Sequence, residues 1–238
     1  MAARHDPYEL LAEYYDGAWY EYSEYMEHLI TDLERESRRR FTKICDAACG
    51  SGLLLQNLDD GERTLSGYDR SSQMIERARM RLPKAEFVEG DIRDTPPFVG
   101  PFDLITCVYD SLNYLLEENE LRRFFRSVRE IIAPEGVLVV DFNNHTMYQE
   151  RDGSLHHRLI GGVGIRERLA YDPGPPPLAV TTFEFPDGVE EHRQRPWEAE
   201  AVEGILVEEG WHLLDTMDVM DDDVDQPSGK VVYIAVPA

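Results

Sequence analysis

A glycine-containing stretch, DAACGSG from Asp46 to Gly52, carries the strongest chemical signal in the sequence. It follows a short apolar run, and Gly50 and Gly52 allow the backbone to turn sharply and a ligand to approach the amides of a following helix. Amides at a helix N-terminus favour an anionic group, whereas Asp46 can accept a hydrogen bond from an ammonium group. The stretch therefore predicts a site for a ligand that carries both charges. A tight turn without a ligand is the alternative for this motif taken alone.

Two acids farther along the chain extend the candidate site toward a nucleotide-like ligand. Asp69 closes the segment GYD, 17 residues after Gly52, where a doubly wound sheet places the carboxylate that binds ribose hydroxyls. Asp91, in the segment EGDI, can accept a hydrogen bond from the exocyclic amine of a base. Nicotinamide-dinucleotide sites also require a third glycine, but position 55 is Leu55, and this counts against a dehydrogenase.

The elements that must hold these residues alternate between residues 43 and 141. Short apolar or β-branched runs predict strands at 43–49, 64–69, 85–90, 102–109 and 136–142, with helices at 52–58, 71–81 and 117–133. Such alternation predicts a parallel, doubly wound α/β sheet. A final helix at 198–209 and strands at 211–220 and 230–238, joined by an acidic turn at 221–225, complete this unit.

Two flanking regions have different patterns. Residues 1–40 are rich in aromatic and acidic residues, and the apolar positions 25, 26, 29, 30 and 33 predict an amphipathic helix that ends at the basic run 38–40. Residues 150–196 contain strand-like runs separated by turn clusters such as DPGPPP. We expect this second region to form a small antiparallel sheet inserted into the chain.

These motifs, in this order, resemble the class I S-adenosylmethionine-dependent methyltransferases over residues 43–141, and more loosely over the final helix and strands. The resemblance implies a Rossmann-like seven-stranded sheet with an antiparallel last strand, and S-adenosylmethionine as the cofactor. It implies cofactor contacts from Asp46, Ala48, Gly50, Gly52, Asp69, Arg70, Met74, Asp91, Ile92, Cys107, Val108 and Tyr109. The expected domains are an N-terminal helical lid (1–40), a cofactor-binding core (41–149 and 197–238) and a substrate cap (150–196).

Three shorter segments narrow the resemblance to a bacterial small-molecule subgroup. They are DSLNYL at 110–115, the pair Tyr15-Asp16, and EHRQR at 191–195. The better-known relatives in this subgroup methylate amines, so the resemblance implies methyl transfer to a small molecule by direct in-line displacement, with nitrogen favoured over oxygen. An O-methyltransferase and a module that binds the cofactor without transferring a methyl group are the alternatives.

Few residues are obligatory for such a reaction, because positioning supplies most of the catalysis. His145 and His192 are candidate bases or substrate anchors, and a structural or solvent-facing role is the alternative for each. Tyr15 is a candidate cap over the cofactor, because an aromatic ring attracts a sulfonium. We also expect substrate contacts from Asn113, Arg195 and Trp197, although pairing with surface acids is the alternative for Arg195.

Charge and composition exclude several other classes. The chain has 47 acidic and 24 basic residues and a net charge of -23, which repels nucleic acids and anionic membranes. Its three cysteines lack metal-ligand spacing, so we expect no metal site. The N-terminus lacks the pattern of a leader, and no apolar segment approaches the length of a membrane span. We expect a cytoplasmic monomer or homodimer with a small-molecule substrate.

Overall fold

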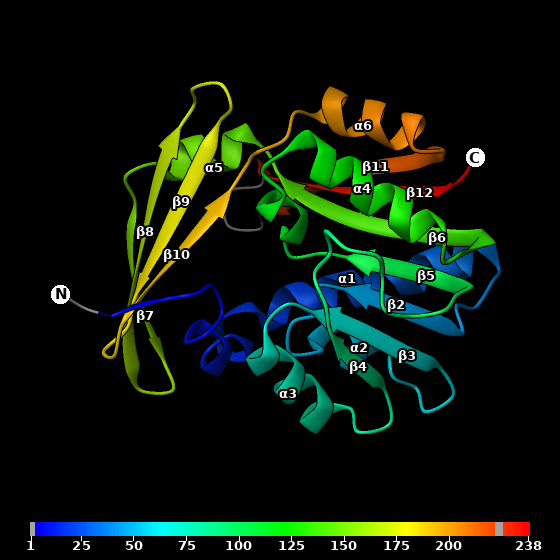
Figure 1. The fold of residues 1–238 in the computed structure, drawn as a ribbon, viewed down its shortest axis with the longest axis horizontal. Helices are drawn as coiled ribbons and strands as arrows, with labels where there is room; N and C mark the ends of the chain where they lie inside the picture. The colour runs from blue at the N-terminus through cyan, green and yellow to red at the C-terminus, as the bar shows by residue number, and fades with distance from the viewer. Residues whose placement is uncertain (1–2, 222–225) are drawn as a thin grey trace.

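The main sheet has seven strands. Their order changes direction at the strand that precedes the glycine-containing stretch, and such a position is called a topological switch point. The structure is a computed structural model that describes residues 3–221 and 226–238. From one edge to the other, the strands are β11 (Trp211–Asp221), β12 (Gln226–Pro237), β6 (Ile132–Asn143), β5 (Phe102–Cys107), β2 (Lys43–Ala47), β3 (Thr64–Asp69) and β4 (Glu86–Glu89) (Figure 1). Strands β2 to β6 are parallel to their neighbours in that group, and β12 is antiparallel to both β6 and β11.

This sheet confirms the predicted Rossmann-like fold with an antiparallel last strand. Several boundaries differ by a few residues; for example, the helix expected at 117–133 ends at Arg129, and β6 begins at Ile132. Ile132 pairs with Phe102 of β5 and is buried, so contacts across the sheet decide the conformation of a segment that local periodicity assigns equally well to a helix. Of the predicted acidic turn, residues 222–225 lie outside the described residues.

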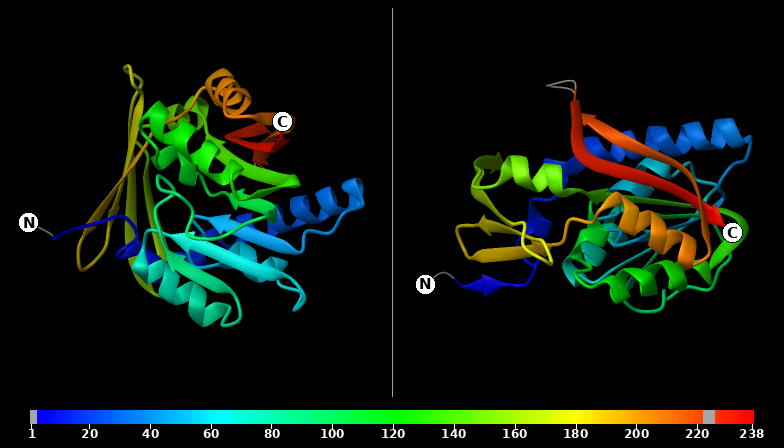
Figure 2. Two further views of the ribbon diagram at one scale, coloured as in Figure 1. Left: turned by 45° about the vertical axis from the view of Figure 1, so that its right-hand side comes forward. Right: turned by 90° about the horizontal axis from the view of Figure 1, so that it is seen from above.

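Helices cover both faces of the sheet, which explains why successive residues of a central strand are buried. Helices α1 (Asp16–Ser37), α2 (Leu53–Leu58) and α3 (Ser72–Arg81) pack on one face, and α4 (Glu118–Arg129) and α6 (Ala199–Glu208) on the other (Figure 2). Leu104 and Ile105 are successive residues of β5 and belong to the two different core clusters. Both are completely buried, as the alternation of side chains in a strand between two helical layers requires.

A second sheet stands at one end of the main sheet. Its order is β1 (Arg4–His5), β10 (Val189–Gln194), β9 (Leu178–Glu184), β8 (Val163–Asp172) and β7 (Leu155–Ile160) (Figure 1). The short helix α5 (His145–Arg151) leads into it from β6, and the 3-10 helix η2 (Ser111–Tyr114) follows β5. The strands β7 to β10 pair antiparallel, whereas β1 is parallel to β10.

The N-terminal region contains other elements besides the amphipathic helix expected from the sequence. Before α1 its residues form β1 and the 3-10 helix η1 (Leu11–Glu13), and they lie beside the second sheet (Figure 1). A two-residue strand whose partner is more than 180 residues away in the sequence has no periodicity of its own. Among the described residues, no helix has the length and hydropathy needed to cross a lipid bilayer.

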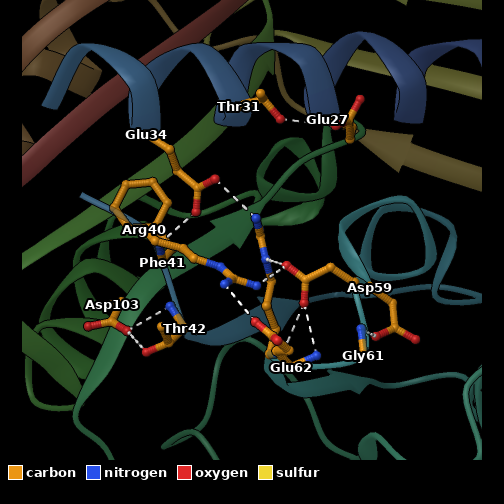
Figure 3. Close-up of polar contacts among 12 residues, drawn as sticks. Glu27, Thr31, Glu34, Arg40, Phe41, Thr42, Asp59, Gly61, Glu62 and Asp103 are labelled. Atoms are coloured by element: carbon orange, nitrogen blue, oxygen red, sulfur yellow. Dashed lines mark hydrogen bonds and ion pairs between the residues drawn. The ribbon is translucent and has the colours of Figure 1, made fainter. Parts of the chain in front are cut away.

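Ion pairs and hydrogen bonds join the end of α1 to the beginnings of β2 and β3 (Figure 3). Arg40 contacts Asp60 and Glu62, and the Phe41 amide donates to Glu34 at 2.6 Å. Thr42 donates to Asp103 through both its amide and its hydroxyl. Exposed pairs of this kind contribute at most about 1 kcal/mol each. They fix the C-terminal end of α1 at the amino-terminal edge of the parallel strands, and the cavities described next lie at the opposite edge.

Candidate active site

The first cavity lies at the carboxyl ends of β2, β3 and β4. It has a volume of about 670 Å³. Its lining residues are Pro7, Tyr8, Tyr15, Ala48, Gly50, Asp69, Arg70, Met74, Gly90, Asp91, Ile92, Arg93, Ser111, Tyr114 and Leu115. The floor is the turn after β2, where Ala48, Gly50 and Gly52 all have left-handed backbone conformations with φ of 56°, 52° and 78°. Such a turn brings backbone amides to the cavity, as the glycines in the sequence predict.

Asp69 fixes the turn after β2 against the end of β3. Its carboxylate accepts hydrogen bonds from the Gly50 amide at 2.9 Å and from the Ser71 amide at 2.8 Å. Burial raises the pKa of Asp69 above its ordinary value. Farther along the cavity, burial opposes ionisation of Asp91, but hydrogen bonds from Arg93 outweigh it and lower the pKa of Asp91. The two acids therefore keep acceptor oxygens at one wall of the cavity.

A smaller cavity of about 270 Å³ lies behind the same turn. It is lined by Tyr15, Asp46, Ala48, Cys49, Gly50, Ser51, Leu53, Leu54, Val108 and Tyr109. The Asp46 side chain is almost completely buried, and Thr106 donates to its Oδ1 at 2.6 Å, whereas no described residue donates to Oδ2. Burial raises the pKa of Asp46 to about 7. A cationic group in this cavity would stabilise the ionised carboxylate.

The second cavity lies between the carboxyl edge of the main sheet and the second sheet. It has a volume of about 660 Å³. Its lining residues are Tyr8, Leu11, Tyr15, Trp19, Tyr109, Asp110, Tyr114, Asn143, Met147, Tyr148, Arg151, Arg158, Glu167, Leu169, Thr181, Phe183, His192 and Gln194. Tyr8, Tyr15 and Tyr114 line both large cavities, and we call these three residues the tyrosine wall. Tyr15 lines all three cavities, so they meet at its ring.

The loop after β5 forms the floor of the second cavity and has an unusual backbone. Tyr109 and Asp110 are both left-handed, with φ of 64° and 50°, a conformation that costs about 1 kcal/mol or more for residues other than glycine. The buried carboxylate of Asp141 accepts hydrogen bonds from both of their amides and from Tyr22. Lys230 lies 2.8 Å from Asp110 and 3.7 Å from Asp141. This network holds the Asp110 carboxylate at the cavity.

Most of the predicted cofactor residues line the first or the small cavity. Ala48, Gly50, Asp69, Arg70, Met74, Asp91 and Ile92 line the first cavity, and Asp46, Val108 and Tyr109 line the small one. Gly52 and Cys107 line neither of them. Gly52 is the left-handed residue at which α2 begins, and Cys107 is completely buried in the core beneath the loop. Both residues shape the site without facing its cavities.

The predicted catalytic and substrate residues divide into two groups. Tyr15 and His192 line the second cavity, where the His192 ring lies 4.9 Å from the Tyr8 ring and 5.0 Å from the Phe183 ring. His145 instead contacts Tyr171 and Glu198, and with Trp197 it lines a separate groove. The structure does not bring His145 and Trp197 to either large cavity.

Asn113 and Arg195 connect parts of the backbone rather than facing a cavity. The amide nitrogen of Asn113 donates to the carbonyls of Asn143 and Arg195, and its oxygen accepts from the Asn143 amide at 2.9 Å. The Arg195 guanidinium donates to the Leu116 carbonyl and lies 3.9 Å from the centre of the Trp197 ring. Asn113 thus joins η2, β6 and the segment after β10, and neither side chain lines the second cavity.

Several residues of the second cavity have no clear signal in the sequence. Tyr114 belongs to the DSLNYL segment, in which Asn113 was the expected substrate contact. Tyr8 and Glu167 lie outside every motif, and only the pairing of distant segments brings them to this cavity. No group of three or more candidate metal ligands gathers within residues 3–221 and 226–238.

Comparisons with known proteins agree with this geometry. A family model described as a methyltransferase domain matches residues 44–136. The putative methyltransferase GWCH70_2453 of Geobacillus sp. strain WCH70 is 28% identical over 96% of this chain and 98% of its own length. The dTDP-3-amino-3,6-dideoxy-alpha-D-glucopyranose N,N-dimethyltransferase of Streptomyces fradiae is 32% identical over 46% of this chain and 42% of its own length. The chain thus spans less than half of this second relative.

Solved structures share the fold of the whole chain. An S-adenosylmethionine-dependent methyltransferase from Clostridium acetobutylicum ATCC 824 superposes with a TM-score of 0.81 at 23% identity, covering 97% of this chain and 99% of that one. DesVI of Streptomyces venezuelae superposes with a TM-score of 0.71 at 23% identity, covering 97% of each chain. With the domain match and the curated relatives, the cavity at the switch point leads to one conclusion. Residues 44–136 form a methyltransferase domain, and the chain as a whole has the fold of S-adenosylmethionine-dependent methyltransferases.

Proposed function

We propose that this enzyme transfers a methyl group from S-adenosylmethionine to an amine nitrogen of a small molecule bound in the second cavity. The observation that carries the proposal is the meeting of three cavities at Tyr15. A ligand that fills the first cavity and the small cavity passes this ring, and the second cavity opens on the other side of the tyrosine wall. Such an arrangement suits an in-line displacement between two bound ligands.

The residues of the first and small cavities fit the cofactor. The buried carboxylate of Asp46, with an acceptor oxygen to which no described residue donates, suits the ammonium of the methionine part. The Asp69 oxygens would accept from the ribose hydroxyls, and Asp91 and Ile92 would contact the adenine. Gly50 has a left-handed backbone, and a Cβ there would lie 3.9 Å from the Tyr15 ring. When bound, S-adenosylmethionine supplies an electrophilic methyl group on a sulfonium.

The chemistry of the second cavity favours an amine over a neutral alcohol. Asp110 and Glu167 line it as hydrogen-bond acceptors, and the aromatic rings of Tyr8, Tyr15 and Trp19 can stabilise a cation. A substrate that arrives as an ammonium gains from both kinds of group, whereas a hydroxyl gains only hydrogen bonds. The relative from Streptomyces fradiae is named for an N,N-dimethyltransferase reaction on an amino sugar, which supports the same choice.

The second cavity also has cationic residues. Arg151 and Arg158 line it, and the Arg158 guanidinium lies 5.6 Å from the centre of the Trp19 ring. Arg158 donates to Glu167 at 2.7 Å. These side chains can contact an anionic part of the substrate while the amine reaches the tyrosine wall. An amino sugar carried on a nucleoside diphosphate combines the two charges.

The test is a turnover assay with a matched pair of sugars. The purified enzyme and S-adenosylmethionine are incubated with dTDP-3-amino-3,6-dideoxy-alpha-D-glucopyranose, or with the same nucleotide sugar bearing a 3-hydroxyl, and products are identified by mass spectrometry. Glycine and glucosamine extend the amine series. We expect methylated amine and an equal amount of S-adenosylhomocysteine. Methylation of the hydroxyl compound alone would contradict the choice of nitrogen, and cofactor binding without turnover of any amine would favour a binding module.

A further inference from the structure

Glu190 of β10 fastens the N-terminal segment to the second sheet. Its carboxylate is completely buried and accepts hydrogen bonds from the amides of Tyr8 at 3.1 Å, Leu11 at 3.0 Å and Leu10. Tyr8 has a left-handed backbone with φ of 66°, which is unfavourable for tyrosine unless surrounding contacts hold it. Three backbone donors on one carboxylate supply such contacts, so Glu190 determines where the Tyr8 side chain lies.

The same carboxylate also orients His192. The His192 Nε2 atom lies 3.0 Å from Glu190 Oε2, and both side chains are buried. An ionised carboxylate can only accept hydrogen bonds, so Nε2 carries the hydrogen and Nδ1 presents a lone pair. The hydroxyl of Tyr114 lies 2.6 Å from Nδ1 and therefore donates to it. Glu190 thus sets the tautomer of His192 through one contact.

The hydrogen-bonded chain continues from Tyr114 to the tyrosine wall. The hydroxyls of Tyr8 and Tyr114 lie 3.0 Å apart, and because Tyr114 donates to His192, Tyr8 must donate to Tyr114. The lone pairs of the Tyr8 oxygen are then left for a donor in the cavities that Tyr8 lines. Burial, reinforced by the negative charge of Asp110, raises the pKa of both tyrosines. They therefore stay protonated and can pass a proton along rather than hold a negative charge.

We propose that Glu190 is a positioning residue that couples docking of residues 8–11 to a proton relay through Tyr8 and Tyr114 to His192. The proposal rests on amine methylation in the second cavity. The substrate ammonium gives one proton to the Tyr8 oxygen, the Tyr8 proton passes to Tyr114, and the Tyr114 proton passes to His192 Nδ1. The freed lone pair of the amine forms the N–C bond while the C–S bond breaks. The electron pair of the C–S bond stays on the sulfur. His192 ends as an imidazolium beside the Glu190 carboxylate.

The surroundings of His192 are consistent with accepting this proton. Glu190 on its own strand, Tyr114 from η2 and Tyr8 from the N-terminal segment contact it, and Phe183 of β9 covers its ring. The carboxylates of Asp110 and Glu167 line the same cavity, and Arg158 pairs with Glu167. Asp110 is paired with Lys230 in turn, so the carboxylate in direct contact with His192 is that of Glu190. If residues 8–11 leave β10, the relay loses Tyr8, so the chain is complete only when the segment is docked.

The first test replaces Glu190 by glutamine. In Glu190→Gln one acceptor oxygen becomes an NH2 group. An NH2 group accepts no hydrogen bond, so it can replace neither the contact with the Tyr8 amide nor the contact with His192 Nε2. We expect hydrogen exchange at the amides of residues 8, 10 and 11 to rise roughly tenfold. We also expect kcat with dTDP-3-amino-3,6-dideoxy-alpha-D-glucopyranose to fall about 100-fold, the usual contribution of a general base. The matched control is Glu184→Gln on β9, which removes a partly exposed pair with Arg166 of β8.

The second test breaks the relay without releasing the segment. Tyr114→Phe keeps the ring and all contacts of Glu190, so exchange at residues 8–11 should stay at the wild-type rate while kcat falls and KM changes little. The rise of kcat with pH that reports proton acceptance should disappear in this variant. Tyr68→Phe is the control, because the Tyr68 hydroxyl is buried without a hydrogen-bond partner and lines none of the three cavities. A structural role alone for Tyr114 would leave the pH profile unchanged and would overturn the relay.

A third measurement needs no substrate. Nitrogen-15 NMR of the histidines in the full chain should show His192 as the Nε2–H tautomer in the wild type and in Tyr114→Phe, and altered in Glu190→Gln. An Nδ1–H tautomer in the wild type, or a Glu190→Gln protein with normal exchange and normal tautomer, would overturn the proposal. If no amine were methylated, the proposed function would fail, and the exchange and NMR results would still decide whether Glu190 couples the segment to His192.

Discussion

The two large cavities share a wall but are assembled in different ways. Apart from N-terminal residues and η2, the first cavity is built by residues 48–93, and its key atoms belong to turns that directly follow β2, β3 and β4. The second cavity draws on seven separate stretches of chain, from the N-terminal segment to β10. A cavity made from local turns can be recognised in a sequence, whereas one made from distant side chains cannot. The comparison predicts that substitutions will act locally at the first cavity and on the whole fold at the second.

The largest effect should come from the charged network beneath the second cavity. Lys230→Met removes the cation beside Asp110 and the fully buried Asp141, so both carboxylates lose its positive charge. Removing one member of a buried pair costs about 3–5 kcal/mol, so we expect the free energy of unfolding in urea to fall by that amount. Lys84→Met is the control, because Lys84 is exposed and its loss should change stability by less than about 0.5 kcal/mol. Equal effects of the two variants would show that the network does not support the fold.

A glycine beneath the first cavity provides the next test. A Cβ on Gly67 would lie 2.8 Å from the Cβ of Cys49 and 2.9 Å from the Phe87 ring, so Gly67→Ala must displace the turn that carries Gly50. We expect a loss of about 1–3 kcal/mol of stability, the usual cost of overpacking. Gly204→Ala is the matched control. It lies in α6 with open space around it, and it should stabilise the protein by about 0.4–1 kcal/mol. If both variants were less stable, or both more stable, than the wild type, the crowding around Gly67 would not explain the result.

At the first cavity itself, Asp69→Ala should weaken the cofactor rather than the substrate. The variant removes the proposed ribose contacts and leaves the Gly50 and Ser71 amides without their acceptor. We expect S-adenosylhomocysteine to bind more weakly by roughly 1–3 kcal/mol, measured by calorimetry. Asp59→Ala is the control, since Asp59 accepts only from the exposed Gly61 amide. Unchanged affinity in Asp69→Ala would mean that the cofactor does not contact this carboxylate.

The smallest effect is a pH dependence of cofactor binding. The pKa of Asp46 is about 7 in the fold, above its value near 4 in an unfolded chain, so the folded state binds its proton more tightly. Stability from this group is present below about pH 4 and lost as the pH rises through 7. A bound ammonium needs the ionised form, so affinity for S-adenosylhomocysteine should rise up to roughly tenfold per pH unit below pH 7. Asp46→Asn should bind more weakly and without this slope, and a slope that persisted would assign it to another group such as Asp69.

The position of a residue could be predicted from the sequence where it depends on the turn that carries the residue. Asp46, Gly50, Asp69 and Asp91 follow strands whose apolar runs are easy to recognise, and all four line the first cavity or the small one. Prediction from the sequence was less successful for the second cavity. Trp197 was an expected substrate contact, but it lies in the core and beside a different groove, because the segment after β10 turns away from the cavity.

The sequence by itself determined the alternation of strands and helices and the turns that line the first cavity, because each depends on residues within one strand–turn–helix unit. The antiparallel last strand was implied by the family resemblance, since it depends on the pairing of β12 with the distant strand β6. Only the tertiary structure decided that Tyr8, Tyr114, Glu190 and His192 form one hydrogen-bonded chain. Glu190 and the amides it binds are separated by about 180 residues, and Tyr8 has no periodic pattern around it. Burial of a carboxylate requires donors from whichever segments pack against it, and no local pattern in the sequence specifies those segments.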